Sequence, residues 1–239
     1  MENYLKITAL IIGIPLFIQI GWFLLTVVYP RHTLYNQSNY KEETGVEFRK
    51  ALFDKGLWGE FLIFIELEKI EGYKRIVSNI YLDKGNDKTE VDLIMVNRYG
   101  IYVFESKNYS GKIYGNDKNK NWVQYVRGRK YKFYNPVSQN NIHINALLKT
   151  LDIADSELVH SYIVFGNKSD LRKISIARPH VTLLQTKDLL TSIAVKQENQ
   201  SKKITVDEID QIYEKLRKYA FADEETKEKH IANINRKYG

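Results

Sequence analysis

The sequence predicts an α/β fold in which helices flank a mixed β-sheet. Residues 91–96 and 101–104 are apolar runs rich in β-branched and aromatic residues, and the turn at 97–100 joins them as a β-hairpin. Helical periodicity at 41–70 and 137–151 alternates with further strand patterns. These patterns cover residues 75–82, 112–114, 122–126, 131–134, 159–165 and 181–184. Such alternation is typical of helices packed on the faces of a sheet.

Composition limits the possible functions. With 239 residues, 44% of them hydrophobic, the chain can bury a full core, and we expect one domain with appendages. It has no cysteine, which excludes a disulfide framework, a thiolate nucleophile and a cysteine zinc site, and which fits a reducing compartment. The formal net charge of +7 predicts a surface that attracts polyanions, either nucleic acid or an anionic membrane leaflet.

A membrane anchor is predicted near the start of the chain. Residues 7–29 carry no charged side chain, and a helix of this length spans about 34 Å, enough for a hydrocarbon layer of roughly 30 Å. Gly13 and Pro15 are tolerated there because a bilayer accommodates a kinked helix. A cleavable signal peptide is the alternative, but the apolar run is too long and no small-residue cleavage site follows. We therefore predict a transmembrane helix within residues 1–30.

The flanking charges predict its orientation. The only positive charges before the apolar run are Lys6 and the amino terminus, whereas Arg31, Lys41 and further basic residues follow it. The positive-inside rule then gives a single-pass protein of the cell membrane with its large C-terminal domain in the cytoplasm. The polar stretch 33–40 is expected to be a linker, so that residues 31–55 hold a linker and a first helix.

Gly56 divides the helical pattern at 41–70 into two helices. The second begins Gly-Leu-Trp-Gly-Glu, which puts Glu60 in a first turn, where the helix dipole favours a carboxylate. Because Gly59 has no side chain, another backbone or a ligand can approach Glu60 closely. Glu60 therefore has a plain structural explanation and is also a candidate site residue.

Residues 112–132 interleave lysines and arginines with tyrosine and tryptophan. This pattern suits a phosphate backbone and exposed bases. Strands with alternating faces would produce the same pattern without any ligand, so both interpretations stay open.

Asn135 and Pro136 are expected to end the preceding strand, and residues 137–151 are expected to form a helix. Gln139 and His143 lie four residues apart and share a face of this helix. A single helical Gln or His is more often a surface or capping residue than a ligand. Further on, a short helix at 187–194 with Thr186 as its cap is expected.

The C-terminal part is predicted to be a helical extension, residues 191–239. Thr205 and Glu208 form a capping box before an amphipathic helix. The charged tail 223–239 has few apolar positions and suits either a surface helix or disorder.

The predicted hairpin brings acidic residues together. Along a strand, Asp92 shares a face with Ile94, and Glu105 shares a face with Val103 and Lys107. If Asp92 pairs near Glu105, two carboxylates and an ammonium occupy one small volume. Because burying such groups without partners costs several kcal/mol, a metal ion is the natural occupant between the acids. The alternative is a solvated strand end.

Four blocks in this order resemble the nuclease-related domain, NERD, of the PD-(D/E)xK nuclease-like superfamily. They are Gly56-x-x-Gly59-Glu60, Glu-Val-Asp-Leu-Ile at 90–94, Gly-Ile-Tyr-Val-Phe-Glu-Ser-Lys-Asn-Tyr-Ser-Gly at 100–111 and Asn135-Pro136-Val137-x-Gln139. The resemblance covers about residues 56–151. It implies a restriction-endonuclease-like core, which we place at residues 56–190.

The resemblance also implies roles for single residues. Asp92 matches the metal-binding aspartate, Glu105 the second acidic ligand and Lys107 the motif lysine. Glu60 matches the acid of the early helix, and Gln139 the glutamine of the later helix. Ser106 stands where such domains often carry Thr and would offer mainly its backbone carbonyl to the metal.

The activity that the resemblance implies is hydrolysis of phosphodiester bonds. The hard oxygen ligands of the implied site favour Mg²⁺ or Mn²⁺. The leading hypothesis is a membrane-anchored, metal-dependent nuclease acting on DNA, in DNA processing or in defence against foreign DNA. The alternatives are a non-catalytic nucleic-acid-binding or scaffold module and a basic protein held to anionic lipid headgroups.

Overall fold

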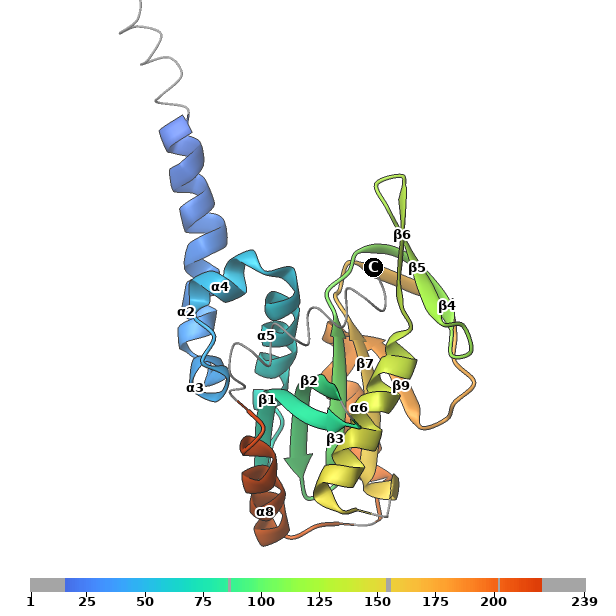
Figure 1. Cartoon of the computed structure of the whole chain (residues 1–239). Coiled ribbons are helices and arrows are strands. Elements are labelled where there is room, and N and C mark those ends of the chain that lie inside the picture. Colours follow the sequence, from blue (N-terminus) through green and yellow to red (C-terminus); the bar gives the residue numbers. More distant parts are fainter. Residues whose placement is uncertain (1–15, 86, 154–155, 202, 221–239) are drawn as a thin grey trace, which may run out of the picture.

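The computed structural model describes residues 16–85, 87–153, 156–201 and 203–220. These residues form an α/β fold with mixed sheets flanked by helices, as the sequence predicted (Figure 1). The larger sheet has the strand order β1-β2-β3-β7-β9. Its strands are β1 (Lys74–Lys84), β2 (Asp87–Asn97), β3 (Gly100–Lys107), β7 (Val159–Phe165) and β9 (Val181–Gln185). The first three are antiparallel, and β7 and β9 run parallel to β3.

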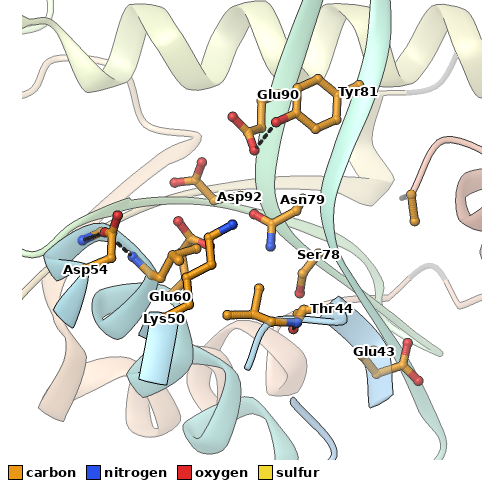
Figure 2. A pocket seen from close by; sticks show the side chains of 14 residues that line it. Glu43, Thr44, Lys50, Asp54, Glu60, Ser78, Asn79, Tyr81, Glu90 and Asp92 are labelled. Atoms are coloured by element: carbon orange, nitrogen blue, oxygen red, sulfur yellow. Dashed lines mark hydrogen bonds between the residues drawn. The ribbon is translucent and has the colours of Figure 1, made fainter. Parts of the chain in front are cut away.

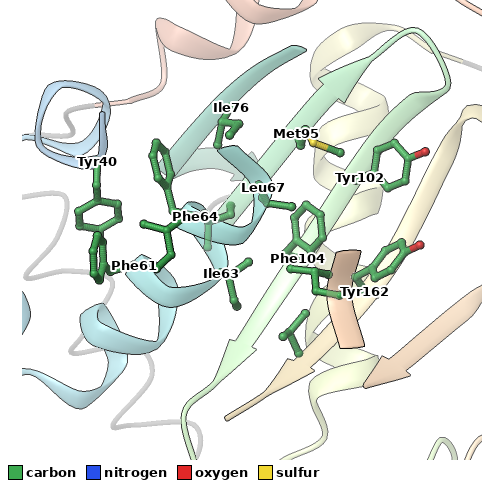
Figure 3. Packing of buried hydrophobic residues seen from close by; sticks show 14 of the residues in the cluster. Tyr40, Phe61, Ile63, Phe64, Leu67, Ile76, Met95, Tyr102, Phe104 and Tyr162 are labelled. Carbon is green, nitrogen blue, oxygen red and sulfur yellow. The ribbon is translucent and has the colours of Figure 1, made fainter. Parts of the chain in front are cut away.

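Helices cover both faces of the larger sheet. On one face, α5 (Lys55–Glu68) and α7 (Leu189–Glu198) pack over a core that includes Phe64, Phe104 and Tyr162 (Figure 3). On the other face, α6 (Pro136–Leu151) and α8 (Val206–Arg217) bury a second cluster rich in Val and Ile. The core is therefore continuous on both sides of β2 and β3, which fixes the register of the strands that carry the acidic residues.

A smaller sheet lies beyond the C-terminal end of β3, with the order β6-β5-β4-β8. Its strands are β4 (Gly111–Asn116), β5 (Asn121–Val126), β6 (Arg129–Tyr134) and β8 (Ser169–Ser175). One face is buried through Ile113 and Trp122, which pack with Phe165 of the larger sheet. The sequence predicted β4, β5 and β6 but not β8, whose residues include few strand-forming side chains.

The region before α5 is helical, which corrects the expected linker at 33–40. The helices are α2 (Tyr29–Asn36), α3 (Tyr40–Thr44) and α4 (Phe48–Phe53). Tyr35 and Tyr40 are buried and contact the ring of Phe61. These aromatic contacts outweigh the polar composition of the stretch and join it to the core.

The described part of the predicted membrane segment is also helical. Residues 16–23 are helical, and η1 (Leu24–Val28), a π-helix, leads into α2. Large apolar side chains are exposed along it, among them Phe17 and Trp22. In the part of the chain that the structure describes, no helix is both long and apolar enough to cross a bilayer. Residues 7–15 of the predicted span, and the tail 223–239, lie outside the described residues.

Two capping predictions have different outcomes. The capping box of Thr205 and Glu208 is present at the start of α8. The predicted cap by Thr186 is wrong, because its hydroxyl donates to the carbonyl of Phe165 and a 3₁₀ turn, η3 (Thr186–Asp188), precedes α7.

Candidate active site

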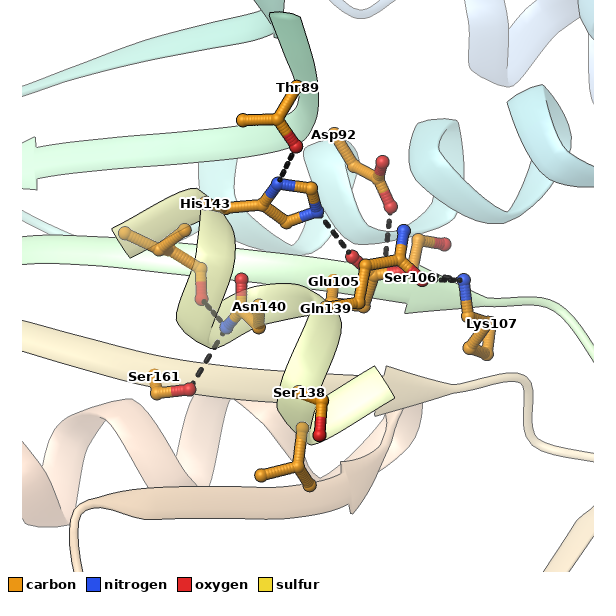
Figure 4. A network of polar contacts seen from close by, with 12 residues as sticks. Thr89, Asp92, Glu105, Ser106, Lys107, Ser138, Gln139, Asn140, His143 and Ser161 are labelled. Atoms are coloured by element: carbon orange, nitrogen blue, oxygen red, sulfur yellow. Dashed lines mark hydrogen bonds and ion pairs between the residues drawn. The ribbon is translucent and has the colours of Figure 1, made fainter. Parts of the chain in front are cut away.

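The site lies where β2 and β3 separate. Their ladder ends at the pair Leu93 and Phe104, so Asp92 and Glu105 are the next residues facing each other beyond it. Asp92 Oδ2 accepts a hydrogen bond of 2.8 Å from the backbone N–H of Ser106 (Figure 4). This bond holds the Asp92 carboxylate beside the strand segment that carries Glu105.

The neighbouring strand is bent at the same level. Asn79 of β1 lies opposite Asp92 in the register and has a φ of 53°. On either side of this position the alternation of faces changes, since Ile80 and Val91 pack beneath α6 and α8, whereas Leu93 packs beneath α5. Asp92 therefore lies where the strand twists locally. Groups from the helices on either face of the larger sheet can approach its side chain there.

Glu105 is fully buried and held from two sides. Its Oε1 accepts from Lys107 Nζ, and its Oε2 lies 3.0 Å from His143 Nε2. His143 Nδ1 in turn lies 2.9 Å from the hydroxyl of Thr89. Burial would raise the pKa of Glu105, but Lys107 and His143 together outweigh it and hold the pKa below its ordinary value. Glu105 is therefore a carboxylate at neutral pH.

Lys107 connects β3 to α6. Its ammonium donates to Glu105 and, at 3.3 Å, to Oε1 of Gln139. Burial would lower the pKa of Lys107, but Glu105 and then Asp92 raise it above its ordinary value. Gln139 is positioned by Asn135, the N-cap of α6, whose side chain accepts from the next two backbone N–H groups.

Glu60 comes from α5 on the opposite layer. The helix begins at Lys55 with Asp54 as its N-cap, so Glu60 lies in the second turn. The expectation that it lies in the first turn is wrong. Gly59 makes the approach possible, because a Cβ there would lie 2.6 Å from Asn108 Cβ. The predicted close approach at Gly59 is confirmed. Its partner is Asn108, which directly follows β3.

The carboxyls of Glu60 and Asp92 lie in an environment that opposes ionisation. Burial raises the pKa of Glu60 to about 8, with added repulsion from Glu90, Asp54 and Glu105. Burial also raises the pKa of Asp92 well above its usual range, and repulsion from Glu105 and Glu60 adds to the rise. One oxygen of Glu60 is buried without a hydrogen-bond partner.

A pocket of about 380 Å³ opens beside these two acids (Figure 2). Glu60 and Asp92 line it, with Asn79 and Glu90 from the strands and Lys50 from α4. The pocket gives solvent and small ions a route to the Asp92 carboxylate.

The side chains of the site partly fit a divalent cation. Across the described ranges, no three His, Cys, Asp or Glu side chains are grouped closely enough to hold a metal ion. The clustering of acids nevertheless fits a hard cation, because a bound cation would favour the ionised forms of Glu60 and Asp92, whose pKa values are raised by burial and by repulsion from neighbouring acids. Asp92 and Glu105 would hold such an ion, with the backbone carbonyl of Ser106 and water completing its shell.

All five residues singled out in the sequence converge here. Asp92, Glu105, Lys107 and Gln139 are linked directly or through Ser106, and Glu60 faces Asp92 across the pocket. Sequence reasoning undervalued His143, and it did not consider Thr89. The four-residue spacing from Gln139 was the only signal for His143, and nothing in the sequence pointed to Thr89.

Comparison with known proteins identifies this region. Residues 55–166 match the family model described as the nuclease-related domain, NERD. These residues form a nuclease-related domain. The NERD segment contains Glu60, Thr89, Asp92, Glu105, Lys107, Gln139 and His143.

A similar protein matches a larger share of the chain. An uncharacterized protein of Bacillus anthracis is 29% identical over 187 residues, which cover 77% of this chain and 85% of that protein. No solved structure matches the chain significantly. The NERD assignment therefore rests on sequence, and the site geometry on the fold described here.

Proposed function

We propose that this protein is a divalent-metal-dependent nuclease that hydrolyses phosphodiester bonds of DNA. The observation that carries the proposal is the meeting of Asp92, Glu105 and Lys107 at the separating ends of β2 and β3, inside a nuclease-related domain. Buried acids with too few counter-charges destabilise a fold unless a ligand compensates for them. Phosphodiester hydrolysis in DNA processing or in defence against foreign DNA would use such a site.

A bound Mg²⁺ or Mn²⁺ would stabilise charge on the phosphoryl oxygens and lower the pKa of a coordinated water. The chain's own groups prepare the site for this chemistry. Lys107 is an ammonium at neutral pH, so we assign it the tasks of offsetting negative charge and orienting the attacking water, and not of removing a proton. Gln139 keeps the Lys107 ammonium aligned with Glu105.

His143 and Thr89 act as positioning residues. The chain of contacts from Thr89 through His143 fixes one oxygen of Glu105 and the ring of His143. Because both residues are buried, this arrangement restricts the Glu105 carboxylate to one orientation.

We further propose that the apolar N-terminal helix anchors the protein in the cell membrane, with the nuclease-related domain on the cytoplasmic side. The uncharged run at 7–29 and the basic residues after it support this. The exposure of Phe17 and Trp22 on the described part of the helix is consistent with a lipid environment.

The test is cleavage by the full-length protein in detergent, with linear, circular, single-stranded and branched DNA, and with RNA, in Mg²⁺ or in EDTA. A fragment starting at Arg31 would cut into α2, so the whole chain is used. We expect cleavage that requires Mg²⁺ and that Lys107→Ala abolishes without unfolding the protein. Cleavage that is unchanged in Lys107→Ala would reject the assignment.

One observation favours a second candidate function. Both oxygens of Glu105 are already engaged, by Lys107 and His143, which is an arrangement that is stable without metal. A non-catalytic nucleic-acid-binding or scaffold module would keep such a closed network. It predicts DNA binding without cleavage in Mg²⁺ and in Mn²⁺.

A further inference from the structure

The positive charge of the chain is concentrated in the small sheet. Residues 111–134 hold seven lysines and arginines against one aspartate, a net charge of +6, in a chain whose formal net charge is +7. That aspartate, Asp117, is buried and lies 3.7 Å from Arg178. A tenth of the sequence therefore provides nearly all of the net charge.

The register separates this sheet into a buried and an outer face. Lys112 pairs with Tyr125, and Tyr125 pairs with Lys130, so these three side chains share one face. Ile113 and Trp122 point to the opposite, buried face. The outer face thus carries lysines and tyrosines next to one another.

The outer face also forms a shallow groove. Lys112, Tyr114, Val123 and Tyr125 line a volume of about 430 Å³. The rings of Tyr114 and Tyr125 meet edge to face at 5.3 Å, and Lys130 Nζ lies 5.8 Å from the Tyr125 ring. Both tyrosines are exposed, 36% and 42% respectively.

The groove is close to the candidate site along the chain. Four residues lie between Lys107 and Lys112, and the five Cα–Cα steps span at most about 18 Å. Asp170, across from Lys112 on β8, is neutralised by Arg172 through hydrogen bonds of 2.7 and 2.9 Å. Asp170 therefore adds little net negative charge to this face.

We propose that this outer face binds single-stranded nucleic acid, with bases stacked on Tyr114 and Tyr125 and phosphates near Lys112 and Lys130. Exposed aromatic rings can stack on unpaired bases, whereas a duplex offers them only its backbone and base edges. An anionic lipid surface would use the lysines but leaves the paired tyrosines unexplained. This inference rests on the proposed function, which makes nucleic acid the ligand. It adds which face of the protein holds a single strand.

The test measures binding without cleavage. Full-length protein in a neutral detergent, with EDTA, is titrated into a fluorescently labelled 20-nucleotide single strand and into the matching duplex. Tyr114→Ala combined with Tyr125→Ala is expected to weaken single-strand binding about tenfold or more and to change duplex binding little. Lys112→Ala combined with Lys130→Ala is expected to reduce the salt slope of single-strand binding by about 1.4.

Two controls match these variants. Tyr131 is as exposed as Tyr125 but lies on the other side of the same hairpin, and Lys149 is exposed on α6. Tyr131→Ala and Lys149→Ala should bind like the wild type. Equal single-strand binding by the double tyrosine variant and the wild type would overturn the proposal.

Displacement of the single strand by phosphatidylserine in the micelles, equal for the wild type and the tyrosine variant, would instead assign the face to lipid and would also overturn it. Because EDTA removes divalent ions, the binding result does not depend on cleavage. A protein that binds single strands but never cuts would refute the nuclease function and leave this inference standing.

Discussion

At the scale of single residues, Glu60 is a group whose ionisation conflicts with its surroundings. Its pKa of about 8 in the folded protein lies above the value near 4.5 of a free glutamate. Between these pH values the native state binds more protons than the unfolded state. The contribution of Glu60 to the stability of the metal-free protein therefore falls as pH rises from about 4.5 through 8.

Glu60→Gln should remove this cost. We expect the variant to raise the thermal midpoint in EDTA at pH 7.5, with a gain that shrinks as pH falls toward 4.5, because both states of the wild type then hold the proton. Thermal unfolding of the wild type and of Glu60→Gln across this pH range measures the gain in thermal midpoint. A gain that is constant with pH would show that Glu60 does not titrate as described.

The site residues differ in how far the sequence predicted them. Strand parity and the hairpin turn predicted that Asp92 and Glu105 lie close together, and the register places them so. The motif resemblance added the roles of Glu60 and Gln139, which helix position alone had left undecided. His143 could not be predicted in its role, because a helical residue is oriented by tertiary packing, and only the packing of α6 on β3 brings it to Glu105.

At the scale of elements, the contact of α5 with the end of β3 positions Glu60. Gly59 packs against Asn108, whose side chain also donates to the carbonyl of Lys55 at 2.8 Å. Gly59→Ala would push the helix away from the strand. We expect it to lower the free energy of unfolding by about 1–3 kcal/mol and to reduce any metal-dependent activity.

Gly21→Ala is the matched control, since a Cβ there meets nothing within 4 Å and the residue is also helical. It should leave stability unchanged or slightly raise it. Chemical unfolding and circular dichroism measure both variants. Equal stabilities would show that the close approach at Gly59 does not constrain α5.

Elements with strong apolar periodicity were predictable, and elements defined by tertiary contacts were not. The hairpin of β2 and β3, and helix α6, follow directly from their patterns. Strand β8 has polar and charged residues and is a strand because it pairs with β4. Residues 33–36 of α2 were expected to belong to a linker because the stretch 33–40 is polar. Their place in the fold depends on the burial of Tyr35 against rings further along the chain, which the local sequence does not reveal.

At the scale of the whole molecule, the apolar helix and the basic small sheet lie in different parts of the fold (Figure 1). The proposed anchor would hold the domain at the membrane, while most of the net charge remains on the small sheet. Charge attracts nucleic acid without determining where the protein is located.

The anchor predicts a specific fractionation result. The full-length protein should stay with the membrane fraction after washing with high salt and with alkaline carbonate, because apolar insertion is insensitive to both. Replacing Leu16, Ile18 and Leu25 with Lys should release it from the pellet. Release of the wild type by salt alone would mean that its attachment is electrostatic and that the proposed anchor is wrong.

The central claim is that Asp92 and Glu105 form one site for a divalent cation, and calorimetric titration with Mn²⁺ tests it most directly. We predict micromolar binding by the wild type, no binding by Asp92→Ala or Glu105→Ala, and unchanged binding by Asp207→Asn, which alters an exposed acid of α8 outside the pocket lining. Equal Mn²⁺ binding by the wild type and both alanine variants, or no binding by any of them, would contradict the account.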